Sequence, residues 1–139
     1  MQNECDRFLV DSNILIYLAD HKDKTKHEAA ISFISSLNKE IVFISAQCLR
    51  EFSSNCLVKK IIPSEIIIDF IESFVSKMIV IQDDYSDNIN AVKLSKTNPS
   101  IFWDANIVSV MLRNEIDCIY TENVKDFQKL GVKAINPLK

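Results

Sequence analysis

The sequence is poor in glycine and proline, with one and three among 139 residues, so no linker rich in these residues divides it. Its longest apolar stretches, such as 14–19 and 66–68, fall well short of the roughly 20 residues that cross a bilayer. The first six residues carry acids and lack the basic start and apolar middle of a secretory signal. We therefore expect one domain over residues 1–139, no membrane segment and, by default, a cytoplasmic location.

The cysteines are few and widely spaced. Cys5, Cys48, Cys56 and Cys118 include no Cys-x-x-Cys pair, and the two histidines are too few to complete an ordinary zinc set. The last three lie in apolar contexts, where cysteine acts as a small hydrophobic residue. The sequence therefore predicts four free thiols.

Composition and charge narrow the class of protein. Hydrophobic residues make up 47% of the chain and charged residues 25%, which is typical of a globular domain and unlike a disordered one. The net charge of −3 argues against indiscriminate binding of nucleic acid by bulk charge. A local basic rim that includes Lys26 and Lys125 is compatible with that charge, although solvated surface is the simpler interpretation of these lysines.

Short apolar runs rich in β-branched or aromatic residues alternate with longer segments of helical periodicity. The runs predict strands at 8–10, 41–44, 78–81, 118–120 and 132–135. The longer segments predict helices at 14–19, 27–37, 46–58, 64–75, 86–94 and 104–113. Because parallel neighbours need crossover connections, this alternation predicts an α/β fold: a three-layer α/β/α sandwich with a central parallel sheet of about five strands.

Three acids stand where a globular domain usually has apolar or neutral residues. Asp11 follows the first strand and is a candidate N-cap of the next helix. If Ser12 caps that helix instead, the Asp11 carboxylate is free to point across the sheet edge. Glu51 borders the apolar face of its helix. Asp104 is the most specific of the three, because it heads the apolar stripe formed by the helix that follows it.

If folding brings these acids together, each ionised pair at 4 Å repels by roughly 4 kcal/mol at an effective dielectric near 20. Protons or a cation must relieve that repulsion. A set of oxygen ligands suits Mg²⁺ or Mn²⁺ better than zinc, so the three acids favour metal-assisted chemistry on a phosphate ester.

Other polar residues are expected near the same edge. Thr121 and Asn123 follow a strand and would hold a water or a phosphate, or simply form a turn and a helix cap. Arg50 and Asn55 flank Glu51 as candidates for a phosphate contact and a supporting hydrogen bond. Trp103, beside Asp104, is expected in the core rather than as a platform for a nucleobase.

Four motifs, in this order, closely resemble the PIN-domain nucleases, especially VapC-type ribonuclease toxins. They are Val10-Asp11-Ser12-Asn13-Ile14-Leu15, Arg50-Glu51-Phe52, Trp103-Asp104-Ala105-Asn106-Ile107 and Tyr120-Thr121-Glu122-Asn123. The closing segment 131–138 is similar to the last strand of the family. The resemblance spans nearly the whole chain and implies the PIN-like fold.

By this resemblance, Asp11, Glu51 and Asp104 would bind Mg²⁺ or Mn²⁺, and Asn123 occupies the position of a fourth acid in many members. Ser12, Asn13 and Thr121 would position substrate or water, and Glu122 or Asp126 would compensate for the missing acid. The implied activity is metal-dependent endoribonucleolytic hydrolysis without a protein nucleophile. The implied partners are an RNA substrate, a small antitoxin protein and a second copy of the chain in a homodimer.

Three alternatives stay open at this stage. The replacement of an acid by Asn123 is also compatible with a catalytically silent module of the same fold that binds RNA or protein. A housekeeping RNA-processing nuclease would have the same motifs as a toxin. An aspartate after the first strand also suits aspartyl-phosphate chemistry, but haloacid-dehalogenase-like enzymes expect a second aspartate two positions on, where this chain has Asn13.

Overall fold

The computed structural model describes residues 5–139, so the first four of the N-terminal residues considered above lie outside it. Five parallel strands form its sheet in the order β3-β2-β1-β4-β5. They are β1 (Phe8–Val10), β2 (Phe43–Ser45), β3 (Ile79–Ile81), β4 (Cys118–Tyr120) and β5 (Lys133–Ile135). The predicted central parallel sheet is therefore confirmed, with β1 in its middle.

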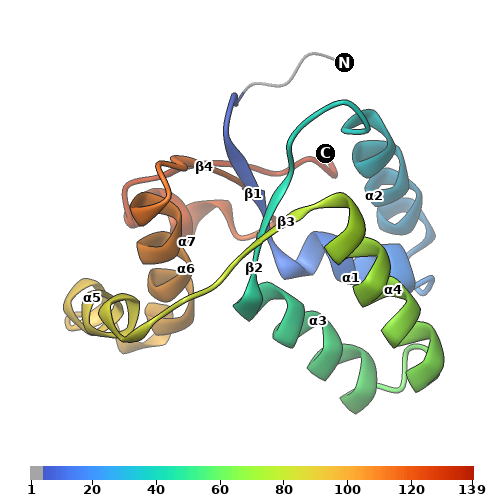
Figure 1. The fold of residues 1–139 in the computed structure, drawn as a ribbon, viewed down its shortest axis with the longest axis horizontal. Coiled ribbons are helices and arrows are strands. Elements are labelled where there is room, and N and C mark those ends of the chain that lie inside the picture. Colours follow the sequence, from blue (N-terminus) through green and yellow to red (C-terminus); the bar gives the residue numbers. More distant parts are fainter. Residues whose placement is uncertain (1–4) are drawn as a thin grey trace.

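Helices cover both faces of this sheet, and Figure 1 shows α1 to α4 on one side and α5 to α7 on the other. The first group is α1 (Ser12–Ala19), α2 (Lys24–Ser36), α3 (Ala46–Val58) and α4 (Ser64–Lys77). The second is α5 (Tyr85–Ser95), α6 (Phe102–Arg113) and α7 (Val124–Lys129), with a short 3₁₀ turn at Pro99–Ile101. No helix within residues 5–139 is both long and apolar enough to cross a membrane.

Alternating side chains of the buried strands feed two hydrophobic cores. In β1, Phe8 and Val10 pack with the α1–α4 layer, whereas Leu9 packs with α6 and α7. In β4, Tyr120 packs with the α1–α4 layer, and Ile119 packs with α6 and α7. Because both faces of the sheet are covered, the central strands β1 and β4 are apolar throughout, which is why these runs stand out in the sequence.

Most predicted elements are confirmed with small shifts at their ends. The second and fifth strands begin one or two residues later than expected, and α4 starts at Ser64 after Pro63, as predicted. The helix α7 was not predicted, because its six residues are too few to reveal a helical period. The three-layer α/β/α prediction holds.

The chain has one glycine, Gly131, which takes a φ of +91° between α7 and β5. Two helices nevertheless end with a left-handed residue that is not glycine: Lys60 after α3 (φ 52°) and Glu115 after α6 (φ 59°). Left-handed backbone costs a residue with a Cβ roughly 1–2 kcal/mol, so the scarcity of glycine has a measurable cost in stability.

The prediction of four free thiols is wrong for two of the cysteines. Cys5 and Cys118 form a disulfide across a sequence separation of 113 residues, with their Cα atoms 6.2 Å apart. The parallel pairing of Phe8 with Cys118 brings the start of the described chain beside β4, and spacing along the sequence does not reveal that proximity. Cys48 and Cys56 are free and buried, as predicted.

Candidate metal centre

The carboxyl ends of β1 and β4 open onto an acidic pocket of about 310 Å³. Its walls are polar, and they combine residues from four separate parts of the chain. They are Asp11, Ser12, Asn13, Glu51, Asp104, Glu122 and Asn123. Seven of the nine residues that the family resemblance assigns to the site therefore line this pocket, and the other two are Thr121 and Asp126.

Asp11 is both the N-cap of α1 and a wall of the acidic pocket. Its Oδ1 accepts the backbone N–H of Ser12 at 2.8 Å, and its Oδ2 accepts the Thr121 hydroxyl at 2.8 Å. Only 5% of Asp11 is exposed. The cap and the site are thus served by one carboxylate, and the alternative in which Ser12 caps the helix is wrong.

Glu51 reaches the pocket from the second turn of α3, a helix capped by the side chain of Ser45. The Ser12 hydroxyl donates to Glu51 Oε1 at 3.0 Å, and the Gln47 amide donates to Oε2 at 3.3 Å. Both carboxylate oxygens of Glu51 therefore have a donor that orients them. Asn55 donates instead to the backbone carbonyl of Glu51, at 2.9 Å, and not to its carboxylate.

Asp104 lies in the first turn of α6, where the helix dipole favours a negative charge. Its Oδ2 accepts the side-chain amide of Asn123 at 2.7 Å. Asn123 occupies the N-cap position of α7 without capping it, because its side chain makes this contact instead. Asn123 thus places a hydrogen-bond donor on Asp104 where a fourth acid would add repulsion.

Burial and the neighbouring negative charges raise the pKa values of Asp11 and Asp104. Burial raises the pKa of Asp11 from its ordinary 3.8 to about 6, and the charge of Glu51 adds to the effect. Burial also raises the pKa of Asp104 to about 7, with further contributions from Asp11, Asp126 and Glu51. Clustered carboxyl groups with raised pKa values are typical of a site that awaits a positive charge.

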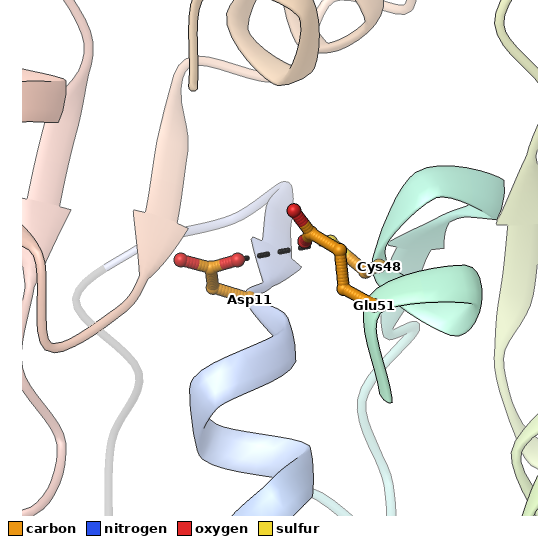
Figure 2. A group of neighbouring side chains, drawn as sticks. All are labelled: Asp11, Cys48 and Glu51. Atoms are coloured by element: carbon orange, nitrogen blue, oxygen red, sulfur yellow. Dashed lines mark hydrogen bonds between the residues drawn. The ribbon is translucent and has the colours of Figure 1, made fainter. Parts of the chain in front are cut away.

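Cys48 lies closer to the acids than the sequence suggested. Figure 2 shows it with Asp11 and Glu51, and the ligand atoms of the three lie within 4.8 Å of one another. The thiol donates to Asp11 Oδ1 at 3.8 Å. Because burial and then the charge of Asp11 raise the pKa of the Cys48 thiol well above its ordinary value, it remains protonated and acts as a donor.

Thr121 supports the site from beneath. It is fully buried, and besides donating to Asp11 its hydroxyl oxygen accepts the backbone N–H of Asn123 at 2.9 Å. The Asn13 amide also approaches this oxygen, at 3.4 Å, and the Asn13 carbonyl oxygen accepts the backbone N–H of Glu122. Thr121 and Asn13 therefore fix the loop after β4 against the start of α1.

The two extra acids behave differently. Glu122 lines the pocket, but its carboxylate pairs with Lys26 at 2.8 Å, and the same ammonium donates to the Tyr17 hydroxyl at 3.2 Å. Asp126 is not among the residues that line the pocket, although its charge acts on Asp104. Lys26 thus puts a cation at the rim, as the basic-rim interpretation proposed for it.

Several neighbours differ from expectation. Trp103 is 63% exposed, so its predicted place in the core is wrong. Arg50 forms an ion pair with Asp83 at 3.3 Å. Gln47, which no sequence motif singled out, is only 3% exposed and contacts Glu51. Its position one helical turn before Glu51 was the only available signal.

A comparison with protein families places most of the chain in one family. The family model described as PIN domain matches residues 8–133, which include the three acids and Asn123. The chain belongs to the PIN domain family. The resemblance read from the four motifs is therefore confirmed, and no curated protein matches this PIN domain by sequence.

Solved structures resemble this PIN domain over nearly its whole length. The Mycobacterium tuberculosis toxin VapC20, which cleaves the sarcin-ricin loop, has a TM-score of 0.72 at 18% identity, with 90% of this chain and 95% of that chain covered. The DNA-bound VapBC complex of Salmonella typhimurium has a TM-score of 0.68 at 18% identity, with 94% of this chain and 98% of that chain covered. A Klebsiella pneumoniae toxin-antitoxin complex has a TM-score of 0.66 at 21% identity, with 93% of this chain and 96% of that chain covered. At these identities the likeness establishes the shared fold.

Proposed function

We propose that this PIN domain is a metal-dependent endoribonuclease that hydrolyses phosphodiester bonds of RNA as the toxin of a toxin-antitoxin pair. One observation carries the proposal: Asp11, Glu51 and Asp104, which are 40 and 53 residues apart in sequence (51 − 11 and 104 − 51), line one pocket at the carboxyl edge of the sheet. Ligand sites of open α/β sheets lie at this edge.

The donor set fits Mg²⁺ or Mn²⁺. Three carboxylates supply the hard oxygen ligands that these ions prefer. When bound, a divalent cation would supply Lewis-acid chemistry to phosphodiester hydrolysis. Ser12 and Gln47 hold Glu51, Thr121 holds Asp11, and Asn123 holds Asp104, so the ligands are oriented before the ion arrives.

The charge in the pocket also explains the need for a cation with an anionic substrate. With all three acids ionised, the pocket would repel a phosphate group, and a bound divalent ion would offset most of that negative charge and present a positive centre to the phosphate. Lys26 at the rim adds a second positive charge beside Glu122. We assign substrate or water positioning to Ser12, Asn13 and Asn123, whose polar side chains line the pocket.

The toxin assignment has separate support. The similar folds named above belong to a toxin that cleaves the sarcin-ricin loop, to a toxin-antitoxin complex and to a DNA-bound VapBC complex. By analogy, this chain would bind a small antitoxin protein that covers the pocket, and two copies of the chain would form a homodimer. Isolation of the native protein with a small partner, and growth arrest on expression without that partner, test this assignment.

Purified protein and RNA test the chemistry. We expect cleavage with Mn²⁺ or Mg²⁺, no cleavage with a chelator, and loss of cleavage in Asp11→Asn and Asp104→Asn. Asp69→Asn is the matched control, because Asp69 is an exposed aspartate of α4 outside the pocket. Metal-dependent cleavage that persists in Asp104→Asn would refute the site assignment.

A catalytically silent module is the second candidate, and two observations favour it. Asn123 stands in place of a fourth acid, and the nearest acid able to compensate, Glu122, already pairs with Lys26. Calorimetric titration with Mn²⁺ separates the candidates. Binding that Asp11→Ala abolishes supports the nuclease, whereas absence of binding at millimolar Mn²⁺ supports the silent module.

A further inference from the structure

The only tryptophan of the chain lies on the surface beside the proposed metal centre. Trp103 is the second residue of α6, directly before Asp104, and 63% of it is exposed. The ring of Phe102 packs edge-on against it with centroids 5.2 Å apart. A large aromatic ring that is left exposed next to an acidic pocket offers a flat apolar surface to a ligand.

Trp103 lines a second pocket, of about 270 Å³, that adjoins the acidic one. We call it the Trp103 pocket, and its walls are Gln47, Arg50, Glu51, Ser54 and Trp103. Four of these residues lie on one face of α3, at spacings of three and four residues, and Trp103 faces them from α6. Glu51 lines both pockets, so the Trp103 pocket lies next to the proposed metal centre.

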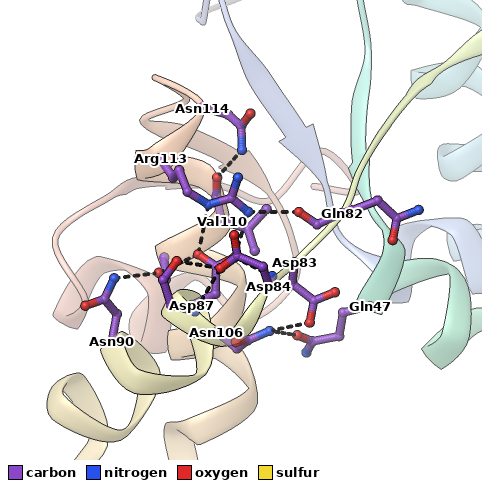
Figure 3. A network of polar contacts seen from close by, with 12 residues as sticks. Gln47, Gln82, Asp83, Asp84, Asp87, Asn90, Asn106, Val110, Arg113 and Asn114 are labelled. Carbon is purple, nitrogen blue, oxygen red and sulfur yellow. Dashed lines mark hydrogen bonds and ion pairs between the residues drawn. The ribbon is translucent and has the colours of Figure 1, made fainter.

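A buried amide fixes the two walls of the Trp103 pocket. Gln47 Nε2 donates to the backbone carbonyl of Trp103 at 3.0 Å and to Glu51 Oε2 at 3.3 Å. Its Oε1 accepts the side-chain amide of Asn106 at 2.9 Å, and Figure 3 shows this contact between α3 and α6. The Gln47 side chain therefore sets the positions of both the Trp103 backbone and Glu51, a proposed metal ligand. This contact fixes the two pockets relative to each other.

Arg50 supplies a positive charge at the mouth of the Trp103 pocket. Its side chain is 61% exposed, and Asp83 holds its guanidinium at 3.3 Å. Asp83 also approaches the Asn106 amide, at 3.4 Å, so the arginine is tied to the same network that holds Gln47. An aromatic face together with a guanidinium is the combination that binds a nucleobase and its phosphate in single-stranded nucleic acids.

We infer that the Trp103 pocket is a nucleobase subsite for single-stranded RNA. The base of a nucleotide next to the phosphate at the metal centre stacks on the indole of Trp103, and Arg50 contacts the neighbouring phosphate. This inference rests on the proposed nuclease function and deepens it by naming the residues that hold the nucleotide next to the cleaved bond. A paired base inside a helix has no free face to stack on Trp103. Stacking accepts every base, so this subsite favours unpaired RNA over a particular sequence.

The fluorescence of the single tryptophan tests the inference directly. The Asp11→Asn variant is used to prevent cleavage, since Asp11 does not line the Trp103 pocket. Short single-stranded RNA is added to this variant, and binding is followed by the anisotropy of a dye on the RNA. We expect quenching of Trp103 in step with binding, and no quenching by an RNA of the same length that carries abasic sites. Saturating binding without quenching would overturn the subsite.

Kinetics of the enzyme with an intact metal centre give a second readout. We expect Trp103→Ala to reduce kcat/KM for single-stranded RNA by about 5- to 100-fold, mainly through KM, while Trp103→Phe keeps most of the activity. Tyr85→Ala is the matched control, because Tyr85 is an exposed aromatic residue outside both pockets. Its kcat/KM should equal that of the wild type.

The outcomes separate the subsite from the proposed function. A wild-type protein that does not cleave RNA with Mn²⁺ refutes the nuclease and the subsite together. Cleavage that is equal in wild type and Trp103→Ala refutes the subsite alone. If Trp103→Ala instead turns a dimer into a monomer and leaves kcat/KM unchanged, the exposed indole serves contact with a second copy and the inference is wrong.

Discussion

Replacing Asp104 with asparagine should stabilise the metal-free protein at pH 8 while it removes metal binding. Burial, together with the charges of Asp11, Asp126 and Glu51, raises the pKa of Asp104 to about 7. Between pH 3.8 and about 7, the folded protein therefore keeps a proton on the Asp104 carboxyl group, whereas the unfolded chain has released it. Stability must fall as the pH rises through that range, because the folded state there binds more protons than the unfolded state.

The magnitude follows from the two pKa values. The interval from 3.8 to about 7, at 1.36 kcal/mol for each pKa unit, corresponds to about 4 kcal/mol for an unscreened group. Asp104 is partly exposed, so solvent screening reduces this figure, and we expect Asp104→Asn to gain about 1–2 kcal/mol at pH 8. The asparagine retains one oxygen that can accept the Asn123 amide, so no donor is left without a partner.

Urea denaturation at pH 4 and pH 8, with a chelator or with Mn²⁺, measures these effects. With the chelator, the gain of Asp104→Asn over wild type should be present at pH 8 and nearly absent at pH 4. Mn²⁺ at 100 times its dissociation constant should stabilise the wild type at pH 8 by about 2.7 kcal/mol and the variant far less. The control Asp69→Asn should stay within about 0.5 kcal/mol of wild type. A variant that loses stability at pH 8, or that gains as much from Mn²⁺ as wild type, refutes the reasoning.

Three further predictions concern stability and positioning. Arg113→Met should lower the free energy of unfolding, measured in urea, by about 3 kcal/mol. The substitution removes the cation that pairs with the fully buried Asp87 at 2.6 Å. A loss below about 1 kcal/mol would contradict this. Lys60→Gly should raise the free energy of unfolding by about 1 kcal/mol, because Lys60 has a left-handed φ of +52°. Lys59→Gly is the control and should bring no such gain, because the φ of Lys59 is −86°. Equal effects of the two substitutions would argue against the left-handed backbone at Lys60. Gln47→Met should weaken Mn²⁺ binding by about 10-fold in calorimetry, as expected when a supporting hydrogen bond to a ligand is removed; unchanged affinity would show that Glu51 needs no such support.

The sequence was most informative where a residue conflicts with its own local pattern. Asp104 heads an apolar stripe on α6, and the structure places it in the wall of the acidic pocket. Asp11 follows a strand that is buried on both faces, which fixes it at the carboxyl edge of the sheet. Helical and strand periodicity therefore located these acids without knowledge of their partners.

The sequence was least informative where a role depends on contacts between distant segments. Gln47 and Asn106 are 59 residues apart, and nothing in their local patterns indicates that their amides meet. The disulfide between Cys5 and Cys118 likewise follows from the pairing of β1 with β4. Trp103 looked like a core residue because apolar character alone does not reveal which side of α6 it occupies.

Anomalous diffraction from crystals grown with Mn²⁺ tests most directly whether the acidic pocket is a metal centre. We predict an anomalous peak in that pocket, within ligand distance of oxygen atoms of Asp11, Glu51 and Asp104, and its loss in Asp11→Asn. An empty pocket at saturating Mn²⁺, or a peak bound only by acids elsewhere on the surface, would contradict the account.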